Sequence, residues 1–365
     1  MDRKEEFKIK VERLRKFLVR HKKQGVLIGT QANFSWVTAG GENRVNTATE
    51  SGAAEILVTR DDVFLIANNI EKDRILEEEV SGLPIKPLGY PWYKEKEKVK
   101  VISRVTDLFK ILSDAASSGG PVNLSPLHFP LTEPELDRYR ELGKKVGEGL
   151  TETAQAIKPG QKETEIAAIM AGIFLADGIV PIVILVAADE RTAKFRHPLP
   201  TENRLKNYVM LVVCGRKNGL VASATRLVSF RKISPELRKK HQAVACVDAA
   251  FILETTPGIA IGKVFKAGVK AYRETGFPQE WHRHHQGGPT GYQPRYFKAF
   301  LTEKRKVVVN SAFAWNPSIT GTKSEDTILI TKTGEPEIIS TDATWPMIEV
   351  EYRGKKINRP DIMLK

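Results

Sequence analysis

Short apolar runs separated by charged segments fill the first third of the chain. Apolar side chains recur at helical spacing over residues 4–22, which predicts an amphipathic helix. Two apolar runs, 54–58 and 63–67, are separated by the polar segment 59–62, which predicts a hairpin. We expect these elements to form a small α/β domain. Its other predicted elements are a strand over 25–29, a helix near 70–80 and a helix near 99–113.

A boundary between two domains is expected near residue 130. The segment 117–121 is rich in glycine, serine and proline, which favour turns. Thr132 can then cap a new helix, which runs to about Ile157. We therefore expect one domain over residues 1–130 and a second domain over residues 131–365.

The second predicted domain contains the same pattern of helix ends twice. Pro159-Gly160 ends one helix and Gly178 ends the next. Pro257-Gly258 and Gly276 mark a second pair of helices in the same way. In both pairs the two glycines are 18 residues apart (160 to 178, and 258 to 276). This equal spacing predicts two related halves that arose by duplication.

Apolar runs that predict strands follow each pair of helices. Strands and helices repeated in two halves favour a curved antiparallel sheet with helices packed outside it. We therefore assign the chain to the α+β class, with an α/β N-terminal domain. The predicted strands are 182–186, 208–213 and 220–224 in the first half, and 307–310, 313–316, 327–330 and 338–339 in the second.

Composition narrows the class of protein. The chain has 365 residues, of which 41% are hydrophobic and 28% charged, as in ordinary globular proteins. No apolar run approaches the ~18 residues of a membrane span, and the charged N-terminus lacks the apolar core of a secretory signal. Cys214 and Cys246 are the only cysteines, as expected of free thiols in a reducing compartment. We expect a cytoplasmic protein with no membrane partner.

The net charge of +13 raises the question of a nucleic-acid partner. The basic residues are spread out: residues 94–98 alternate in sign, and Lys22-Lys23 is an isolated pair. Long blocks of like charge are absent from the sequence. A solvated surface is therefore favoured over a nucleic-acid interface, and we expect a small-molecule substrate as the partner.

The most distinctive segment for chemistry is Trp281-His282-Arg283-His284-His285-Gln286-Gly287-Gly288. Together with four other segments, in order along the chain, it resembles the creatinase / aminopeptidase P / prolidase family, which is peptidase family M24 with the pita-bread fold. The resemblance covers nearly the whole chain and implies a cytoplasmic homodimer. The other segments are Val213-Cys214-Gly215, Ser223-Ala224-Thr225-Arg226, Asn316-Pro317-Ser318 and Glu325-Asp326-Thr327.

The resemblance implies five positions at which active family peptidases carry the ligands of two metal ions. They are Val213, Ser223, His285, Asn316 and Glu325, so only two of the five keep a ligand type. Two hard divalent ions held close together need several carboxylates to balance their charge. We therefore expect no cofactor, and a divalent metal such as Mn or Zn is the alternative. A single ion on His284, His285 and Glu325 stays open.

The retained histidines are the candidates for proton transfer, because the ordinary pKa of histidine lies near neutrality. The resemblance matches His197 to a substrate-side histidine of the family. We expect His197 and His285 to form an acid/base pair, and Glu325 to orient an imidazole or bind a cationic group. The glycine-rich turn that ends at Tyr292 lets backbone approach a ligand. The expected substrate-binding residues are Asn316, His284, Tyr292, Arg196 and Arg226, with the two arginines as carboxylate contacts.

Three functional hypotheses follow. The first is a metal-independent, creatinase-like hydrolase that cleaves a C–N bond of a small guanidino, amide or dipeptide-like metabolite. The second is an Xaa-Pro dipeptidase or aminopeptidase of the M24 type that uses metal ions. The third is a non-catalytic binding protein on the same fold, for which salt-sensitive nucleic-acid affinity would be the discriminating property. We prefer the first, because histidines are retained where the carboxylates of the metal cage are lost.

Overall fold

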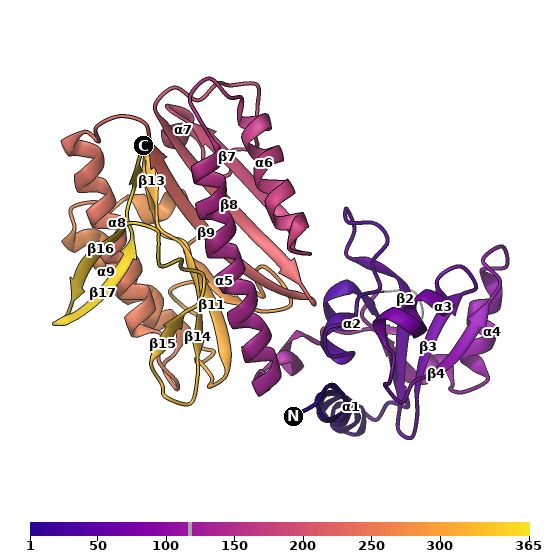
Figure 1. The fold of residues 1–365 in the computed structure, drawn as a ribbon. Coiled ribbons are helices and arrows are strands. Elements are labelled where there is room, and N and C mark those ends of the chain that lie inside the picture. Colours follow the sequence, from indigo (N-terminus) through magenta and orange to yellow (C-terminus); the bar gives the residue numbers. More distant parts are fainter. Residues whose placement is uncertain (116–118) are drawn as a thin grey trace. The chain divides into compact units, whose positions relative to one another are not determined.

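The computed structural model describes residues 1–115 and 119–365 (Figure 1). Residues 116–118, which include part of the predicted turn-rich segment, lie outside the described residues. The chain divides into two compact units, each with its own apolar core. One unit consists of Met1–Glu135 with Asn218–Leu220, and the other of Leu136–Lys217 with Val221–Lys365.

A mixed six-stranded sheet with helices around it forms the first unit (Figure 1). Its strands are β1 (Gly25–Thr30), β2 (Ser51–Thr59), β3 (Val63–Asn68), β4 (Lys86–Tyr90), β5 (Ile111–Ser113) and β6 (Gly120–Pro121), in the order β4-β3-β2-β1-β5-β6. Its helices are α1 (Arg3–Arg20), α2 (Gln31–Val37), α3 (Lys72–Arg74), η1 (Ile75–Glu79), α4 (Lys96–Ser103), η2 (Leu108–Lys110) and η3 (Ser125–His128).

Sheet pairing overrides the expected helix at the end of this unit. The predicted helix near 99–113 ends at Ser103, and residues 111–113 form β5 instead. β5 pairs in parallel with β1, which buries Ile111 against Leu27 and Leu57. A short apolar run fits a buried strand as well as a helix, so the spacing alone could not separate the two. Helix α2 was not expected from the pattern.

The second unit repeats a pair of helices, as the spacing of the glycines predicts. The first pair is α5 (Glu133–Ala156) and α6 (Glu163–Ala176), and the second is α8 (Pro235–Glu254) and α9 (Ile261–Glu274). Gly160 and Gly258 turn the chain between the helices of each pair, with φ of +92° and +85°. Glycine adopts positive φ without a Cβ clash, which explains its recurrence at these helix ends. The predicted duplication is confirmed.

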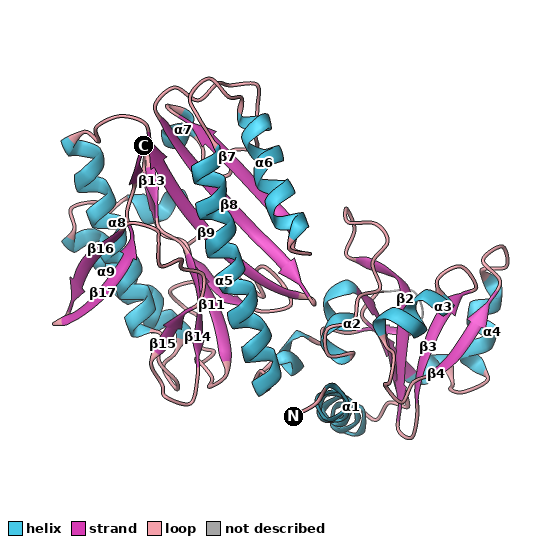
Figure 2. Cartoon of the chain, viewed as in Figure 1, coloured by secondary structure: helices cyan, strands magenta, loops and turns pink. Residues whose placement is uncertain are grey.

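Two four-stranded sheets lie in the second unit (Figure 2). One has the order β18-β9-β8-β7 and the other β10-β11-β14-β15, and an isolated bridge between Thr225 and Glu325 connects them. The α+β class and the two-halved architecture are confirmed, although β18 joins its sheet in parallel. The strands are β7 (Val180–Ala188), β8 (Tyr208–Lys217), β9 (Leu220–Ser229), β10 (Gly287–Thr290), β11 (Ser311–Trp315), β14 (Asp326–Ile330), β15 (Pro336–Ile338) and β18 (Met363–Leu364).

Short elements complete the second unit. The predicted strand over 307–310 is wrong: Val308 and Val309 are exposed, and of the three valines only Val307 is buried, bonded through its backbone to Ile259. No helix among the described residues is long and apolar enough to cross a membrane. The remaining elements are α7 (Arg191–Lys194), η4 (Glu280–Arg283) and the hairpins β12 (Ser318–Ile319)–β13 (Thr322–Lys323) and β16 (Met347–Tyr352)–β17 (Lys355–Pro360).

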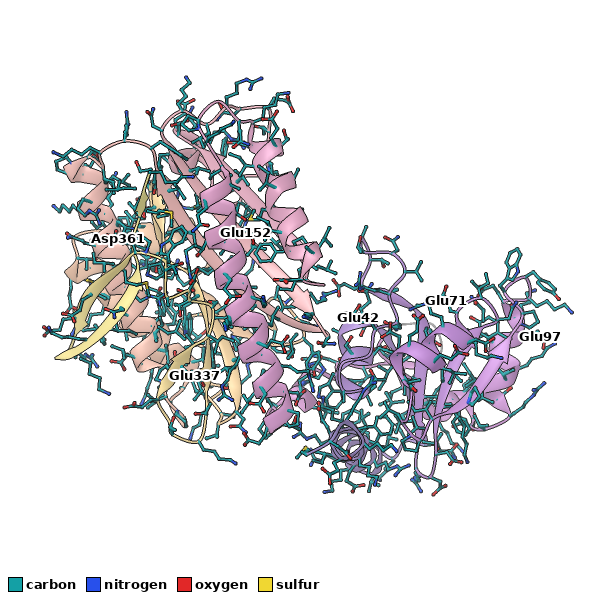
Figure 3. The ribbon with its side chains drawn as sticks, viewed as in Figure 1. Glu42, Glu71, Glu97, Glu152, Glu337 and Asp361 are labelled. Carbon is teal, nitrogen blue, oxygen red and sulfur yellow. The ribbon has the colours of Figure 1, made fainter. Side chains whose placement is uncertain are left out.

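Ion pairs at the edges of the second unit connect elements far apart in the sequence. Arg140 on α5 pairs with Glu337 on β15, and Arg238 on α8 pairs with Asp361 near the C-terminus (Figure 3). These side chains are partly exposed, so we expect each pair to contribute little to stability. The fold is held mainly by apolar packing, such as the stacking of Trp315 on Phe251 beneath the second sheet.

Candidate active site

Three histidines from two distant segments meet in the second unit. His197 follows α7, and His284 and His285 follow the single turn η4. The Nε2 atoms of His197 and His284 are 3.2 Å apart. The ring centroid of His285 lies 4.4 Å from that of His284 and 5.7 Å from that of His197. The structure therefore places together His197, His284 and His285, which we call the histidine cluster.

Gln286 and Gly287 fix the segment that carries two of these histidines. The Gln286 side chain is fully buried, and its Nε2 donates to the carbonyl oxygen of His284 at 2.5 Å. Tyr272 donates its hydroxyl to Gln286 Oε1 at 2.8 Å. Gly287 has φ of +102°, and a Cβ there would collide with the backbone of Ala314 on the neighbouring strand. A glutamine and a glycine are thus needed to place the histidines at the start of β10.

Burial keeps the two adjacent histidines neutral. Desolvation lowers the pKa of His284 to about 2, and the nearby Lys323 acts in the same direction. Desolvation also lowers the pKa of His285 to about 4, with Arg295 as the next cause. His197 is more exposed, and partial burial followed by Lys323 lowers its pKa from 6.5, although Glu325 opposes this. All three rings are therefore neutral imidazoles at neutral pH, each with one nitrogen lone pair.

Two ring nitrogens of the cluster have no protein partner. Among the residues that the structure describes, Nδ1 of His284 and Nδ1 of His285 are both buried and make no hydrogen bond. A buried polar atom without a partner costs roughly 1–3 kcal/mol. Such atoms at a cluster of titratable side chains are typical of a site that binds something.

A cavity of about 620 Å³ lies beside the cluster. Its lining includes His284 and His285 together with the aromatic side chains of Phe265, Trp281 and Phe300. Mostly apolar walls with a few polar groups are typical of small-molecule sites. The cavity could hold a small substrate with an apolar portion against the rings and a polar portion toward the histidines.

The surviving carboxylate, Glu325, is enclosed by cations of the chain itself. Its Oε2 accepts hydrogen bonds from Lys323 Nζ at 2.6 Å and from Thr225 Oγ1 at 2.7 Å. Its Oε1 lies 3.8 Å from Arg295 Nη2. Burial alone would raise the pKa of Glu325, but Lys323 and Arg295 more than offset this and hold its pKa below the ordinary value. Glu325 is therefore a buried, ionised carboxylate whose charge is already compensated.

These contacts correct the roles expected of Glu325. We expected it to orient an imidazole or to bind a cationic substrate group. No hydrogen bond joins Glu325 to an imidazole in the described parts of the chain, and its oxygens already contact Lys323, Thr225 and Arg295. Glu325 instead fixes the positions of two cations that influence the cluster.

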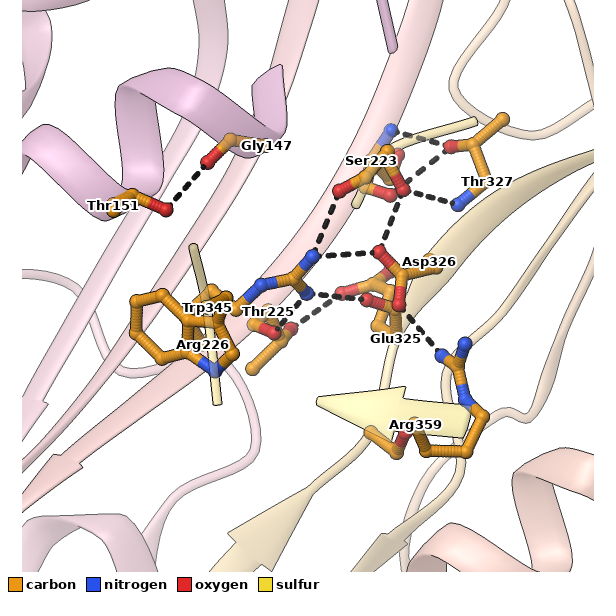
Figure 4. Close-up of polar contacts among 12 residues, drawn as sticks. Gly147, Thr151, Ser223, Thr225, Arg226, Glu325, Asp326, Thr327, Trp345 and Arg359 are labelled. Carbon is orange, nitrogen blue, oxygen red and sulfur yellow. Dashed lines mark hydrogen bonds and ion pairs between the residues drawn. The ribbon is translucent and has the colours of Figure 1, made fainter. Parts of the chain in front are cut away.

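Arg226 is also misassigned by the sequence, because it cannot reach a substrate. Its side chain is completely buried, and Nη2 contacts Asp326 Oδ1 at 3.0 Å and the carbonyl oxygen of Ser340 at 2.7 Å (Figure 4). Arg359 binds the other oxygen of the same aspartate, Oδ2, at 2.6 Å. Arg226 is therefore a structural residue that connects β9 to β14.

Arg196 and Tyr292 do not have the expected surroundings either. Arg196 Nη2 is held by Glu280 at 3.0 Å and by the Thr320 hydroxyl at 3.0 Å, so an acidic partner already occupies this face of its guanidinium. Tyr292 is fully buried, so its side chain presents no surface to a ligand from solvent. Asn316 is buried, and its Oδ1 lacks a hydrogen-bond partner among the described residues.

Three further residues of the site were missed in the sequence. Lys323 lies two residues before Glu325, and alternate residues of an extended segment share a face, so this pairing had a detectable pattern. No sequence pattern could have identified Arg295, because only the fold places it beside Glu325. Cys214 accepts a hydrogen bond from the Ser223 hydroxyl at 3.2 Å, and burial raises the pKa of its thiol. Nη1 of Arg295 is buried and makes no hydrogen bond within the described residues.

A comparison with protein families identifies the scaffold. Residues 137–332, more than half of the chain, match the sequence model of metallopeptidase family M24. The chain belongs to this family. The recognition made from the motifs is thereby confirmed, and the scaffold is that of the M24 hydrolases. A search among curated proteins finds no match.

Solved structures agree on the M24 fold at low sequence identity. A prolidase from Pyrococcus horikoshii OT3 is 16% identical, with a TM-score of 0.77 over 92% of this chain and 99% of that chain. An Xaa-Pro dipeptidase from Bacillus anthracis is 15% identical, with a TM-score of 0.76 over 98% and 100%. The N-terminal domain of FACT complex subunit SPT16 from Cicer arietinum is 11% identical, with a TM-score of 0.68 over 92% and 96%.

The residues at the five M24 ligand positions do not fit a pair of metal ions. Val213 is buried and offers no donor atom. The Ser223 hydroxyl is directed to Cys214, and Glu325 is compensated by Lys323. Two divalent ions would therefore find one neutral amide, one imidazole and one carboxylate already paired with an ammonium group. This M24 chain therefore lacks the negative charge that a two-metal centre requires.

Proposed function

We propose that this M24 family member hydrolyses a small dipeptide of the Xaa-Pro type, or a closely related amide, at the histidine cluster rather than at a two-metal centre. The observation that carries the proposal is the meeting of three neutral imidazoles beside the aromatic cavity. The scaffold match to prolidase and Xaa-Pro dipeptidase structures supports this substrate class over the guanidino compounds of our first hypothesis.

The side chains suit the cleavage of a C–N bond by water. A neutral His197 can accept a proton from the attacking water, and its contact with His284 Nε2 gives that proton a partner ring. The oxygen then bonds to the carbonyl carbon, the C–N bond breaks, and the leaving nitrogen takes a proton from an imidazole. Trp281 and Phe300 provide apolar surface for a proline ring.

Arg295 replaces Arg226 as the proposed contact for the substrate carboxylate. It is buried beside His285 and Glu325, and its Nη1 atom has no hydrogen-bond partner in the described chain. A buried guanidinium donor without a partner, close enough to act on His285, favours an anionic group there. Glu325 keeps this arginine in position from the Nη2 side.

The test is proline release from a panel of Xaa-Pro dipeptides, with guanidino compounds in parallel. Chelator-treated protein is assayed with and without added manganese. We expect turnover of at least one dipeptide without manganese, a loss of about 100-fold or more for His197→Ala and His285→Ala, and a raised KM for Arg295→Met. The control variant His21→Ala, at an exposed position of the first unit, should match the parent protein.

Two outcomes would overturn the proposal. Turnover that appears only with manganese and survives both histidine substitutions would point to a conventional metallopeptidase. Absence of turnover for every compound, with an intact fold, would favour a non-catalytic binding protein. The unsuited ligand positions favour that second candidate. The N-terminal domain of FACT complex subunit SPT16 has a similar fold. Salt-dependent binding to nucleic acid would then be measured directly.

The homodimer and the cytoplasmic location remain proposals that rest on the family resemblance. A small-molecule substrate in place of a nucleic-acid partner is likewise a proposal, supported by the size of the cavity.

A further inference from the structure

The histidine cluster has the dimensions of a metal-binding site that is separate from the five M24 ligand positions. One potential ligand atom from each of His197, His284 and His285 lies within 4.8 Å of the other two. The Nε2–Nε2 separation of 3.2 Å between His197 and His284 is close to the distance of about 3.3 Å between two nitrogen ligands of one tetrahedral zinc ion. Only His285 belongs to both sets of residues.

Two of the three rings keep a buried nitrogen without a partner among the described residues. An imidazole binds a metal through a lone pair and must be neutral to do so. The buried Nδ1 atoms of His284 and His285 have no partner among the described residues, so neither ring is tied to the protein through that nitrogen. Ligands that are exclusively imidazoles favour zinc and similar transition metals over magnesium, calcium or manganese, which prefer oxygen.

Three of the cationic side chains around the cluster lie close to carboxylates. Lys323 is paired with Glu325, and Arg196 is paired with Glu280. Arg295 shares the same glutamate at 3.8 Å. Lys323, Arg196 and Arg295 therefore each have a carboxylate close by, which reduces their repulsion of an ion. Lys298, which lines the cavity and also acts on His197, adds a positive charge that opposes a cation.

The cluster also leaves room for a fourth ligand. His197 is exposed, and the aromatic cavity of about 620 Å³ borders the other two histidines. Three protein ligands with an open fourth position are typical of catalytic zinc sites, whereas structural sites use four protein ligands.

We propose that His197, His284 and His285 bind a single zinc ion, or a metal ion of similar preference, with a fourth position open to water or substrate. This site is built from one histidine after α7 and two before β10. The proposed hydrolysis concerns the metal-free cluster, because an ion bound to His197 would occupy the lone pair that accepts a proton from water. Zinc binding without turnover therefore supports this inference alone, and turnover without zinc binding supports the hydrolysis alone.

The test is titration of chelator-treated full-length protein with cobalt(II) and zinc(II), read by calorimetry and by the visible absorption of cobalt. We expect one ion per chain, an absorption spectrum typical of tetrahedral cobalt, and displacement of cobalt by zinc. His197→Ala should weaken binding by about 100-fold or more, as should His284→Ala. Because His197 is exposed, its substitution should leave the fold intact, which thermal unfolding would verify.

His282→Ala is the matched control, because this exposed histidine lies in the same segment but outside the cluster. It should bind cobalt as tightly as the parent protein. Absence of binding by the parent protein, two ions per chain, or an affinity unchanged by His197→Ala would each overturn the proposal.

Discussion

Arg226 shows how a single residue can match a family motif and still serve the fold. Its guanidinium, that of Arg359 and the carboxylate of Asp326 form a fully buried network of alternating charge (Figure 4), and Arg359 also pairs with the buried Asp248. Arg226 also lies over the Trp345 ring, with Cζ 5.7 Å from its centroid. Every charge in this network depends on its neighbours, because a buried ion without a partner is costly.

We predict that Arg226→Met destabilises the protein strongly. Asp326 would keep only one of its two guanidinium partners, and breaking a buried pair from one side costs about 3–5 kcal/mol. Urea unfolding measures the difference. Lys356→Met, which removes an exposed partner of Glu349, is the matched control and should leave the free energy of unfolding unchanged within error. Equal effects of the two substitutions would contradict this account of the network.

The partners of Arg226 could not be predicted from the sequence. The arginine and Asp326 are 100 residues apart, and nothing in either local pattern connects them. The same holds for Arg295 beside Glu325. The histidines were recoverable because their residue type is rare and chemically distinctive, whereas an arginine fits a substrate contact and a buried ion pair equally well.

At the scale of elements, the duplicated helices differ in how tightly they pack. Gly172 on α6 faces open space, and a Cβ there would meet nothing within 4 Å. Gly268 on α9 packs directly on the Phe251 ring of α8, and a Cβ there would overlap the ring. The two helices have the same length of 14 residues, so their glycines form a natural comparison.

We predict opposite effects of alanine at these two glycines. Gly172→Ala should stabilise the protein by about 0.5–1 kcal/mol, because alanine loses less backbone entropy in a helix. Gly268→Ala should destabilise it by about 1–3 kcal/mol, because the added methyl group forces the core apart. Thermal and urea unfolding of both variants provide the check, and stabilisation by Gly268→Ala would show that the α8–α9 contact is looser than described.

The duplicated helices and the strands β1, β2, β3 and β8 were predictable because their patterns are local, whereas α2 and β5 were not. Proline–glycine pairs end helices wherever they occur, and the equal spacing of two such pairs revealed the duplication. The prediction for residues 307–310 failed because three consecutive valines favour a strand locally, whereas in the described chain this segment pairs through Val307 with the loop before α9. Local preference cannot show whether a partner strand is present.

At the scale of the whole molecule, each unit buries a neutral histidine outside the histidine cluster. Burial lowers the pKa of His128 in the first unit to about 3 and that of His241 in the second to about 4. His128 Nε2 donates to Asn33 Oδ1 at 2.7 Å. In the unfolded chain each histidine would regain an ordinary pKa near 6.5 and would take up a proton that the folded state excludes.

We predict that acid weakens the fold through these residues. The unfolded state binds more protons as the pH falls below about 6.5, so stability decreases by up to about 1.4 kcal/mol per pH unit for each buried histidine until its folded pKa is reached. His128→Gln should remove one of the protons taken up on unfolding and so make the free energy of unfolding less dependent on pH. Urea unfolding between neutral and mildly acidic pH measures this dependence. His21→Gln, at an exposed position, is the control. A slope unchanged by His128→Gln would show that His128 is not buried as a neutral ring.

Lys323 places a positive group that cannot dissociate beside the Glu325 carboxylate. A metal ion is exchangeable, so an active centre built on one depends on supply, on chelators and on competing ions. An ammonium group carried on the polypeptide is present in every copy from the moment of folding. The positive charge beside Glu325 is therefore part of the polypeptide and is not taken up from solution. We expect the surroundings of Glu325 to keep their shape when metal ions are scarce.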